Sequence, residues 1–167
     1  MTSDSYKNQI LEMVESHDII AGYSMRFDVS VPQQWAQHHP MEPLVVFVEE
    51  LRKQYPLSHK EIDYFFSQFG QCIWPVMILK KRTFLRFCDN LFPLLDKIFQ
   101  RIGTPYNSYQ NRYLCFLVER FIPFWLHIER LNPARVPTMT LYTPEVLPPG
   151  RTKSDTPNRI YVQKAHV

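Results

Sequence analysis

The chain has 167 residues, of which 45% are hydrophobic and 21% are charged. This composition supports the core of one domain of ordinary size and excludes a wholly disordered chain. The net charge of +3 is only mildly basic, and without a basic patch or a motif it does not indicate nucleic-acid binding, so we expect no nucleic-acid partner.

The amino-terminal part combines helix, strand and turn signals. Residues 6–14 carry a partial helical face, and residues 18–24, DIIAGYS, are typical of a short buried strand. Pro32, Pro40 and Pro43 then argue against one long helix. We therefore expect a short helix, a strand and an interrupted segment.

Two helices are predicted between Pro43 and Gly70. The first begins near Pro43, a residue that suits a first helical turn, and ends at Pro56. Ser58 and Glu61 match a capping box at the start of the second helix, which Gly70 is expected to end.

The strongest strand signal is residues 72–81, CIWPVMILKK, a short apolar run bounded by Gly70 and by charged residues. A long amphipathic helix follows, with Thr83 as its expected N-cap and Gly103 as its end. Pro93 lies inside this helix and is expected to kink it. The apolar residues recur with a helical period at positions 84, 87, 88, 91, 95, 98, 99 and 102.

A further helix is expected from Ser108 to about Leu131. On a helical wheel, Arg112 and Glu119 fall on one line, two turns apart and edged by aromatic rings. This stripe is either a solvated face, where exposed ion pairs contribute only about 0.3–0.5 kcal/mol, or a partly buried binding surface. Pro123 removes a backbone donor and is expected to bend the helix. The predicted core face holds Leu114, Val118, Phe121 and Trp125.

Together these elements predict an α+β fold that is mostly helical with a few short strands. Residues 136–143, VPTMTLYT, suggest an added edge strand. We expect residues 1–143 to form a single globular domain. Residues 144–167 are rich in proline and are expected to form an extended or disordered tail.

Residues 105–126, PYNSYQNRYLCFLVERFIPFWL, resemble the C-terminal signature of a bacterial glycosyltransferase family. That family occurs in capsular and exopolysaccharide gene clusters and was long catalogued as a domain of unknown function. Its signature is Asp-x-Tyr-Gln-x-Arg followed by Gly-Phe-Leu-Ser-Glu-Arg, and Asn107, Cys115 and Val118 replace the usual Asp, Gly and Ser. The matching residues are Tyr109, Gln110, Arg112, Phe116, Leu117, Glu119 and Arg120.

The resemblance covers roughly residues 10–140. Residues 18–39 are similar to the family's Asp-Ile-Ile strand and its Gln-aromatic-x-x-x-His segment. Residues 74–98 are similar to its Lys-Lys strand and the helix that follows, with Pro75 in place of the usual Asn. The upstream matches are Asp18, Ile19, Ile20, Gln34, Trp35, His39, Lys80, Lys81, Cys88, Leu91 and Phe92.

The resemblance implies that the chain corresponds to the C-terminal part of a GT-A glycosyltransferase and lacks the half that binds the nucleotide sugar. That half carries the acidic residues suited to a divalent metal, and no Asp-x-Asp occurs in this chain. The implied function is the acceptor-side part of an enzyme that moves a sugar from a nucleotide-sugar donor in bacterial surface polysaccharide synthesis. The isolated chain is then expected to be inactive and to hold no cofactor, whereas the complete enzyme would use a divalent metal, Mn²⁺ or Mg²⁺. The implied partners are a saccharide or lipid-linked acceptor, and a separate donor-binding half or a second copy of the chain. The alternative is a non-catalytic truncated relative that binds a protein or a saccharide.

Seven residues are the candidate substrate contacts, and no metal ligand is assigned. Arg112 and Arg120 suit a phosphate or a sugar carboxylate, and Glu119 can orient Arg112 or accept from a hydroxyl. The other interpretation of these three residues is a buried structural ion pair. Trp35 either stacks on a sugar or belongs to the core. The full set is Trp35, His39, Tyr109, Gln110, Arg112, Glu119 and Arg120.

The basic and aromatic residues 80–87, KKRTFLRF, suit either an anionic membrane surface or plain solvent. Cys72, Cys88 and Cys115 form no CxxC pattern and are expected to be buried and inert. Neither a signal-peptide pattern nor an apolar run of about 20 residues is found. The expected location is the cytoplasm, or the inner face of the membrane as a peripheral contact.

Overall fold

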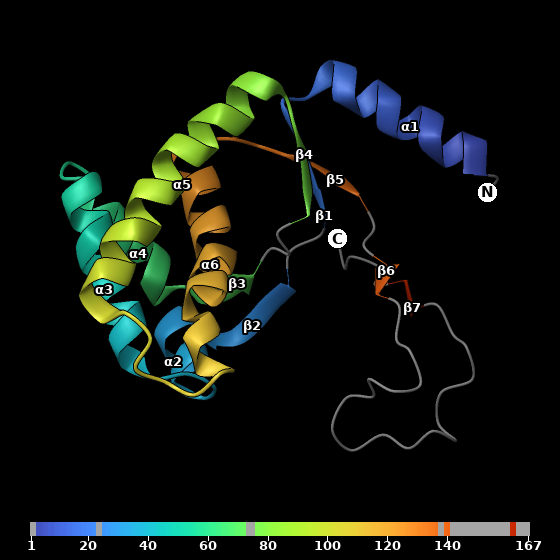
Figure 1. The fold of residues 1–167 in the computed structure, drawn as a ribbon. Helices are drawn as coiled ribbons and strands as arrows, with labels where there is room; N and C mark the ends of the chain where they lie inside the picture. Colours follow the sequence, from blue (N-terminus) through green and yellow to red (C-terminus); the bar gives the residue numbers. More distant parts are fainter. Residues whose placement is uncertain (1–2, 23–24, 73–75, 137–138, 141–160, 163–167) are drawn as a thin grey trace, which may run out of the picture.

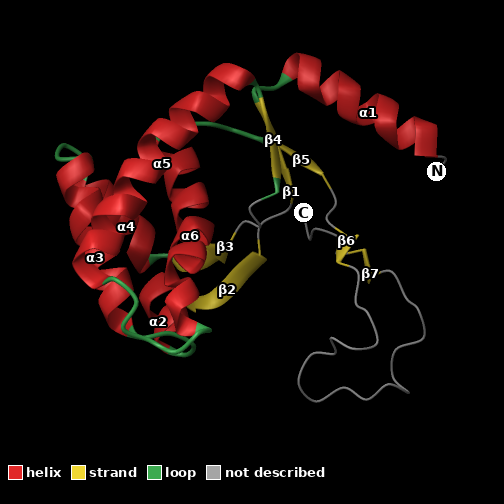
Figure 2. Cartoon of the chain, in the orientation of Figure 1, coloured by secondary structure: helices red, strands yellow, loops and turns green. Residues whose placement is uncertain are grey.

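The computed structural model describes residues 3–22, 25–72, 76–136, 139–140 and 161–162. The fold is α+β and mostly helical with a few short strands, which confirms the predicted fold class (Figures 1 and 2). The helices are α1 (Ser3–Ser16), α2 (Val31–Ala36), α3 (Met41–Gln54), α4 (His59–Ser67), α5 (Lys81–Ile102) and α6 (Tyr113–Ile128), with a 3₁₀ turn, η1 (Gln110–Arg112), before α6.

A small mixed sheet lies at one end of the helical body, with α1 projecting beyond it (Figure 1). Its central strand is β1 (Ile19–Gly22), which pairs antiparallel with β4 (Met77–Leu79) and parallel with β5 (Ala134–Val136). Since Ile19, Ile20 and Ala21 are all buried, β1 is the strand that anchors the sheet to the core. Two further pairs are β2 (Met25–Ser30) with β3 (Phe69–Cys72), and β6 (Met139–Thr140) with β7 (Tyr161–Val162).

The helical body is formed by α3, α5 and α6, which pack against one another, while α2 and α4 pack against α3. Aromatic rings dominate its centre and meet largely edge to face, as Phe87 does with Trp125 at a centroid distance of 5.1 Å. Side chains with less than 2% of their surface exposed fill this core: Trp35, Trp125, Tyr113, Phe47, Phe121, Phe124, Leu51, Ile62, Leu94 and Ile98.

Several predicted helix ends are wrong. The N-cap of α5 is Lys80, whereas Thr83 is buried in the first turn. Helix α4 ends at Ser67, and Gly70 lies in β3 rather than at the helix end. Ser58 is the N-cap of α4 as predicted, but its side chain makes no capping hydrogen bond. Pro93 lies inside α5, and the helix continues through it.

The predicted strand over residues 72–81 is divided. Its beginning belongs to β3 and its end to β4, and residues 73–75 lie outside the described part of the chain. The predicted edge strand over residues 136–143 overlaps β5 only at Val136 and contains β6, while residues 137–138 and 141–143 lie outside the described part of the chain. Most of the predicted tail, residues 144–160 and 163–167, also lies outside the described residues, so that prediction is untested.

Within the part of the chain that the structure describes, no helix has both the length and the apolar character needed to cross a membrane. This finding agrees with the absence of a long apolar run in the sequence.

Candidate functional site

The segment before α6 is a folded turn and not the first turn of the helix. Ser108 was predicted to start the helix, but α6 starts at Tyr113, with Arg112 as its N-cap. Asn107 accepts a hydrogen bond through Oδ1 from the backbone N–H of Gln110 (2.9 Å). The Asn111 side chain bonds both the N–H and the carbonyl of Tyr106 (3.0 and 2.7 Å). These bonds hold the turn in one shape and set the position of Tyr109 and Gln110.

Arg120 is buried at the contact between α6 and α2, with 4% of its surface exposed. Its guanidinium donates to Gln34 Oε1 (2.6 Å), to the Phe116 carbonyl (3.0 Å) and to Glu119 Oε2 (2.7 Å). It also lies over the Trp35 ring, 5.5 Å from the centroid. Arg120 therefore ties two helices together, and every acceptor it uses belongs to the chain.

This arrangement corrects the predicted stripe. Glu119 forms its ion pair with Arg120 (2.7 Å), which agrees with the interpretation of these residues as a buried structural ion pair and not with Glu119 orienting Arg112. The predicted core face is also partly wrong, because Leu114 and Val118 are only half-buried. The buried residues of α6 lie on most of its circumference: Tyr113, Phe116, Leu117, Arg120, Phe121, Ile122, Pro123, Phe124, Trp125 and Leu126.

Trp35 is a core residue in this structure. No part of its surface is exposed, and its indole Nε1 donates to the Pro40 carbonyl (2.6 Å). Both its ring faces and its donor are used within the chain, so it is not available to stack on a sugar. Its position beside His39, at a ring-centroid distance of 4.7 Å, makes it a support for that side chain.

His39 is the most constrained polar ring near the surface. It stacks on Phe116 at a centroid distance of 4.3 Å and lies 6.3 Å from the Tyr109 ring. Its Nδ1 is 3.0 Å from Gln110 Oε1, while Gln110 Nε2 donates to the His38 carbonyl (2.9 Å). Because the Gln110 amide uses its NH₂ on His38, its oxygen must accept from His39, and Nδ1 carries the proton.

The remaining ring nitrogen of His39, Nε2, makes no hydrogen bond among the described residues. Burial lowers the pKa of His39, and the positive charges of Arg120 and His38 act in the same direction, although the Gln110 hydrogen bond opposes them. The neutral ring is therefore favoured, and Nε2 keeps a lone pair that accepts from a hydroxyl or takes a proton.

Tyr109 and Arg112 form the exposed rim beside His39. Tyr109 is 54% exposed, and the Arg112 guanidinium lies over the Phe116 ring, 5.7 Å from its centroid. Since Arg112 is exposed and forms no ion pair in the described part of the chain, its planar donor group is free to bind an anion in two-point fashion. We call His39, Tyr109, Gln110 and Arg112 the His39 site.

The structure divides the seven predicted contacts into two groups. His39, Tyr109, Gln110 and Arg112 meet at the surface, where α2 lies beside the turn that precedes α6 (Figure 1). Trp35 and Arg120 point into the core, and Glu119 is a partly exposed partner of Arg120.

Two supporting residues were not predicted as part of the site. Phe116 forms the floor under His39, and the buried Gln34 accepts from Arg120. Gln34 is one of two adjacent glutamines in the short helix α2 and stands next to Trp35. The available signal was the Gln-aromatic-x-x-x-His segment, in which Gln34 is the matching glutamine.

Other predicted features give no site. The described residues contain no group of three or more His, Cys, Asp or Glu side chains that could hold a metal ion, and we assign no metal ligand to this chain. Cys115 is exposed and Cys88 is half-buried, so the prediction that both are buried is wrong.

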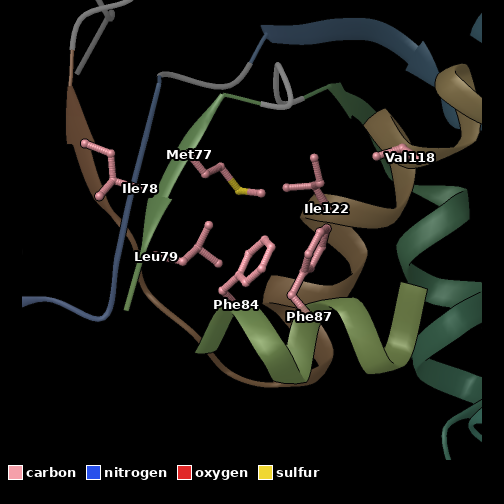
Figure 3. Close-up of a pocket in the computed structure, with 7 residues that line it drawn as sticks. All are labelled: Met77, Ile78, Leu79, Phe84, Phe87, Val118 and Ile122. Atoms are coloured by element: carbon pink, nitrogen blue, oxygen red, sulfur yellow. The ribbon is translucent and has the colours of Figure 1, made fainter. Parts of the chain in front are cut away.

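A second surface feature is an open apolar cleft between the sheet and the helical body (Figure 3). It lies between β4, α5 and α6 and shares no residue with the His39 site. Its lining is Met77, Ile78, Leu79, Phe84, Phe87, Val118 and Ile122.

The fold and the site define a class: an α+β domain whose helical body carries a His-Gln-Arg surface site supported by a buried arginine. More particularly, the chain belongs to the family described as "Domain of unknown function (DUF4422)", whose model matches residues 2–130. That span includes the His39 site and its support. No curated protein and no solved structure was found to match the chain.

Proposed function

We propose that this chain is the acceptor-side part of a glycosyltransferase that uses a nucleotide-sugar donor in bacterial surface polysaccharide synthesis. The observation that carries the proposal is the His39 site itself. His39 and Gln110 come from segments about seventy positions apart, and both belong to the motifs that resemble the glycosyltransferase family. Their direct hydrogen bond means that two distant motifs form one surface.

The chemistry of the site suits a sugar. The His39 Nε2 lone pair can accept a hydrogen bond from a sugar hydroxyl, and the exposed Tyr109 ring offers an apolar face. Arg112 can bind a phosphate or a sugar carboxylate through two parallel hydrogen bonds. In the transfer step, a neutral histidine next to the acceptor hydroxyl is also suited to act as a base.

Under this proposal, the donor-binding half is a separate chain or part of a longer protein, or a second copy completes the site. Mn²⁺ or Mg²⁺ would belong to the complete enzyme, and we derive no step through it. The complete enzyme would act in the cytoplasm, at the inner face of the membrane, on a saccharide or lipid-linked acceptor.

The test is sugar transfer by the chain combined with the donor-binding half encoded beside its gene. We expect no turnover from the isolated chain and measurable turnover from the mixture. Arg112→Met should lower turnover at least tenfold, since a charged two-point contact contributes roughly 1.5–3 kcal/mol. The matched control is Arg52→Met, because Arg52 is likewise exposed but lies on α3.

Equal turnover by wild type, Arg112→Met and His39→Asn would contradict the proposal. Binding of sugars to the chain without any transfer in the mixture would instead support the alternative, a non-catalytic saccharide-binding relative. Melting temperatures measured on the same samples separate a loss of contact from a loss of folding.

A further inference from the structure

The apolar cleft has the size and lining of a ligand site. Its volume is about 450 Å³, within the roughly 300–1,000 Å³ that is usual for small-molecule pockets. None of its lining side chains carries a hydrogen-bonding group. Met77, Leu79, Phe84, Phe87 and Ile122 point into a shared space from one strand and two helices, whereas the Ile78 side chain points to the opposite side of β4 (Figure 3).

Apolar side chains also continue from the cleft to the surface. Phe84 lines the cleft and is 49% exposed, and its neighbour in the sequence, Leu85, is 50% exposed. Exposed large apolar residues gathered in one place indicate a contact surface.

A cluster of positive charge lies in the first turn of α5, the turn that also contributes Phe84 to the cleft. Lys81 and Arg82 are exposed, and neither forms an ion pair within the described residues, whereas Lys80 pairs with Asp18 at 3.1 Å. The first turn of α5 contains no acidic residue. The helix N-terminus adds a partial positive charge of its own, so this edge of the cleft favours an anion.

We propose that the cleft binds one hydrocarbon chain of an anionic lipid, with the headgroup at Lys81 and Arg82. A hydrocarbon chain suits the cleft because it brings in no polar group that would need a hydrogen bond. The backbone of a partner peptide would bring in such groups, and among the described residues only the outer edge of β4, not the lining side chains, offers them partners. The free charges of Lys81 and Arg82 then select an anionic headgroup over a neutral or cationic one.

This inference deepens the proposed function, since it names the chemical class that would anchor a lipid-linked acceptor, and it rests on that function for its biological role. The cleft and the His39 site share no residue. The experiment below measures binding without any sugar donor, so a failure here and a failure of sugar transfer can be told apart.

The probe is dodecyl phosphate, titrated calorimetrically into the full chain below its micelle concentration. We expect saturable binding of one molecule per chain. Dodecyltrimethylammonium and inorganic phosphate should bind at least tenfold more weakly, because one lacks the anion and the other lacks the chain. The absence of saturable binding, or equal binding of inorganic phosphate, would overturn the proposal.

Phe84 and Leu85 form a matched pair, because they are adjacent on α5 and equally exposed, but only Phe84 lines the cleft. Phe84→Ser should weaken dodecyl phosphate binding about tenfold, because it removes an apolar contact with the hydrocarbon chain. Leu85→Ser should weaken the same binding by less than about twofold. Equal losses in both variants would mean a flat surface contact and would overturn the cleft assignment.

Two further measurements test the headgroup and the occupant. The double variant Lys81→Glu with Arg82→Glu should retain the fold and lose the preference for dodecyl phosphate over dodecyltrimethylammonium. An unchanged preference would refute the headgroup site. Sedimentation velocity should show a monomer. A dimer that Phe84→Glu dissociates would show that a second copy fills the cleft, and the lipid proposal would fail.

Discussion

Replacing Arg120 by methionine should destabilise the chain strongly, although Arg120 lies next to the His39 site. Methionine keeps the apolar stem but removes the guanidinium that now bonds Gln34, Glu119 and the Phe116 carbonyl. Gln34 is 9% exposed and would lose the partner of its side-chain oxygen. The carboxylate of Glu119, 28% exposed, would lose its ion pair with Arg120.

The expected loss is about 2–4 kcal/mol, because each stranded buried polar group contributes roughly 1–3 kcal/mol and Glu119 keeps some contact with water. In a chain of this length, that corresponds to a fall in melting temperature of roughly 5–15 °C. The free energy of unfolding is measured by urea denaturation for wild type and Arg120→Met.

Arg112→Met is the matched control, since it removes the same charge from an exposed position, and its only described partner is the Phe116 ring. It should change the free energy by less than about 1 kcal/mol. A cycle with Gln34→Met should show a coupling energy of about 1 kcal/mol or more with Arg120→Met. An Arg120→Met variant within about 0.5 kcal/mol of wild type would refute the assignment of Arg120 as a structural tie.

Two further predictions concern titration and charge. Burial lowers the pKa of His39 below its ordinary 6.5, so the contribution of His39 to stability is full above pH 6.5 and is lost as pH falls through the folded pKa. His39→Gln should therefore flatten this part of the plot of urea midpoint against pH. Parallel plots for wild type and His39→Gln would contradict the prediction. Arg101→Met should lower the urea midpoint, because it removes one of the two positively charged partners of the buried Glu50. Arg52→Met breaks only the exposed pair with Asp63 and should change stability by less than about 0.5 kcal/mol. Equal shifts of the urea-denaturation curves in the two variants would contradict the expectation that the pair with buried Glu50 matters more than the exposed pair.

The elements that were predicted well have strong local patterns. Helix α5 has apolar residues at helical spacing, and three of the predicted positions, Phe87, Leu91 and Ile98, are buried. Strand β1 is a short apolar run that is buried along its length. In both elements the pattern within a few residues decides the structure, so the sequence is sufficient to find them.

The misplaced elements depend on contacts that are distant in sequence. Helix α6 is buried on most sides, and a helix of this kind has no single apolar face for a wheel to find. Residues 69–79 contribute to two strands because β3 pairs with β2 and β4 pairs with β1, two different partners. No local signal distinguishes one long strand from two short strands that belong to different sheets.

The same reasoning explains why the candidate site was predicted only in part. The motif residues Tyr109, Gln110 and Arg112 were found, but nothing in the spacing of the chain predicts the hydrogen bond between Gln110 and His39. The burial of Arg120 was foreseen only as one alternative, a buried structural ion pair, and its partner Gln34 was not predicted because it lies 86 positions away.

A charged motif residue can serve a site without touching its ligand, and Arg120 illustrates how. It fixes α2 against α6 through Gln34, and α2 leads directly into His39, while Phe116 on α6 supports the His39 ring. The position of His39 therefore depends on the same contact that Arg120 holds together. Loss of Arg120 should impair any ligand binding at the His39 site together with stability, whereas loss of Arg112 should impair binding alone. That difference would show that the two arginines of one motif have different roles: Arg120 supports the site, and Arg112 contacts the ligand.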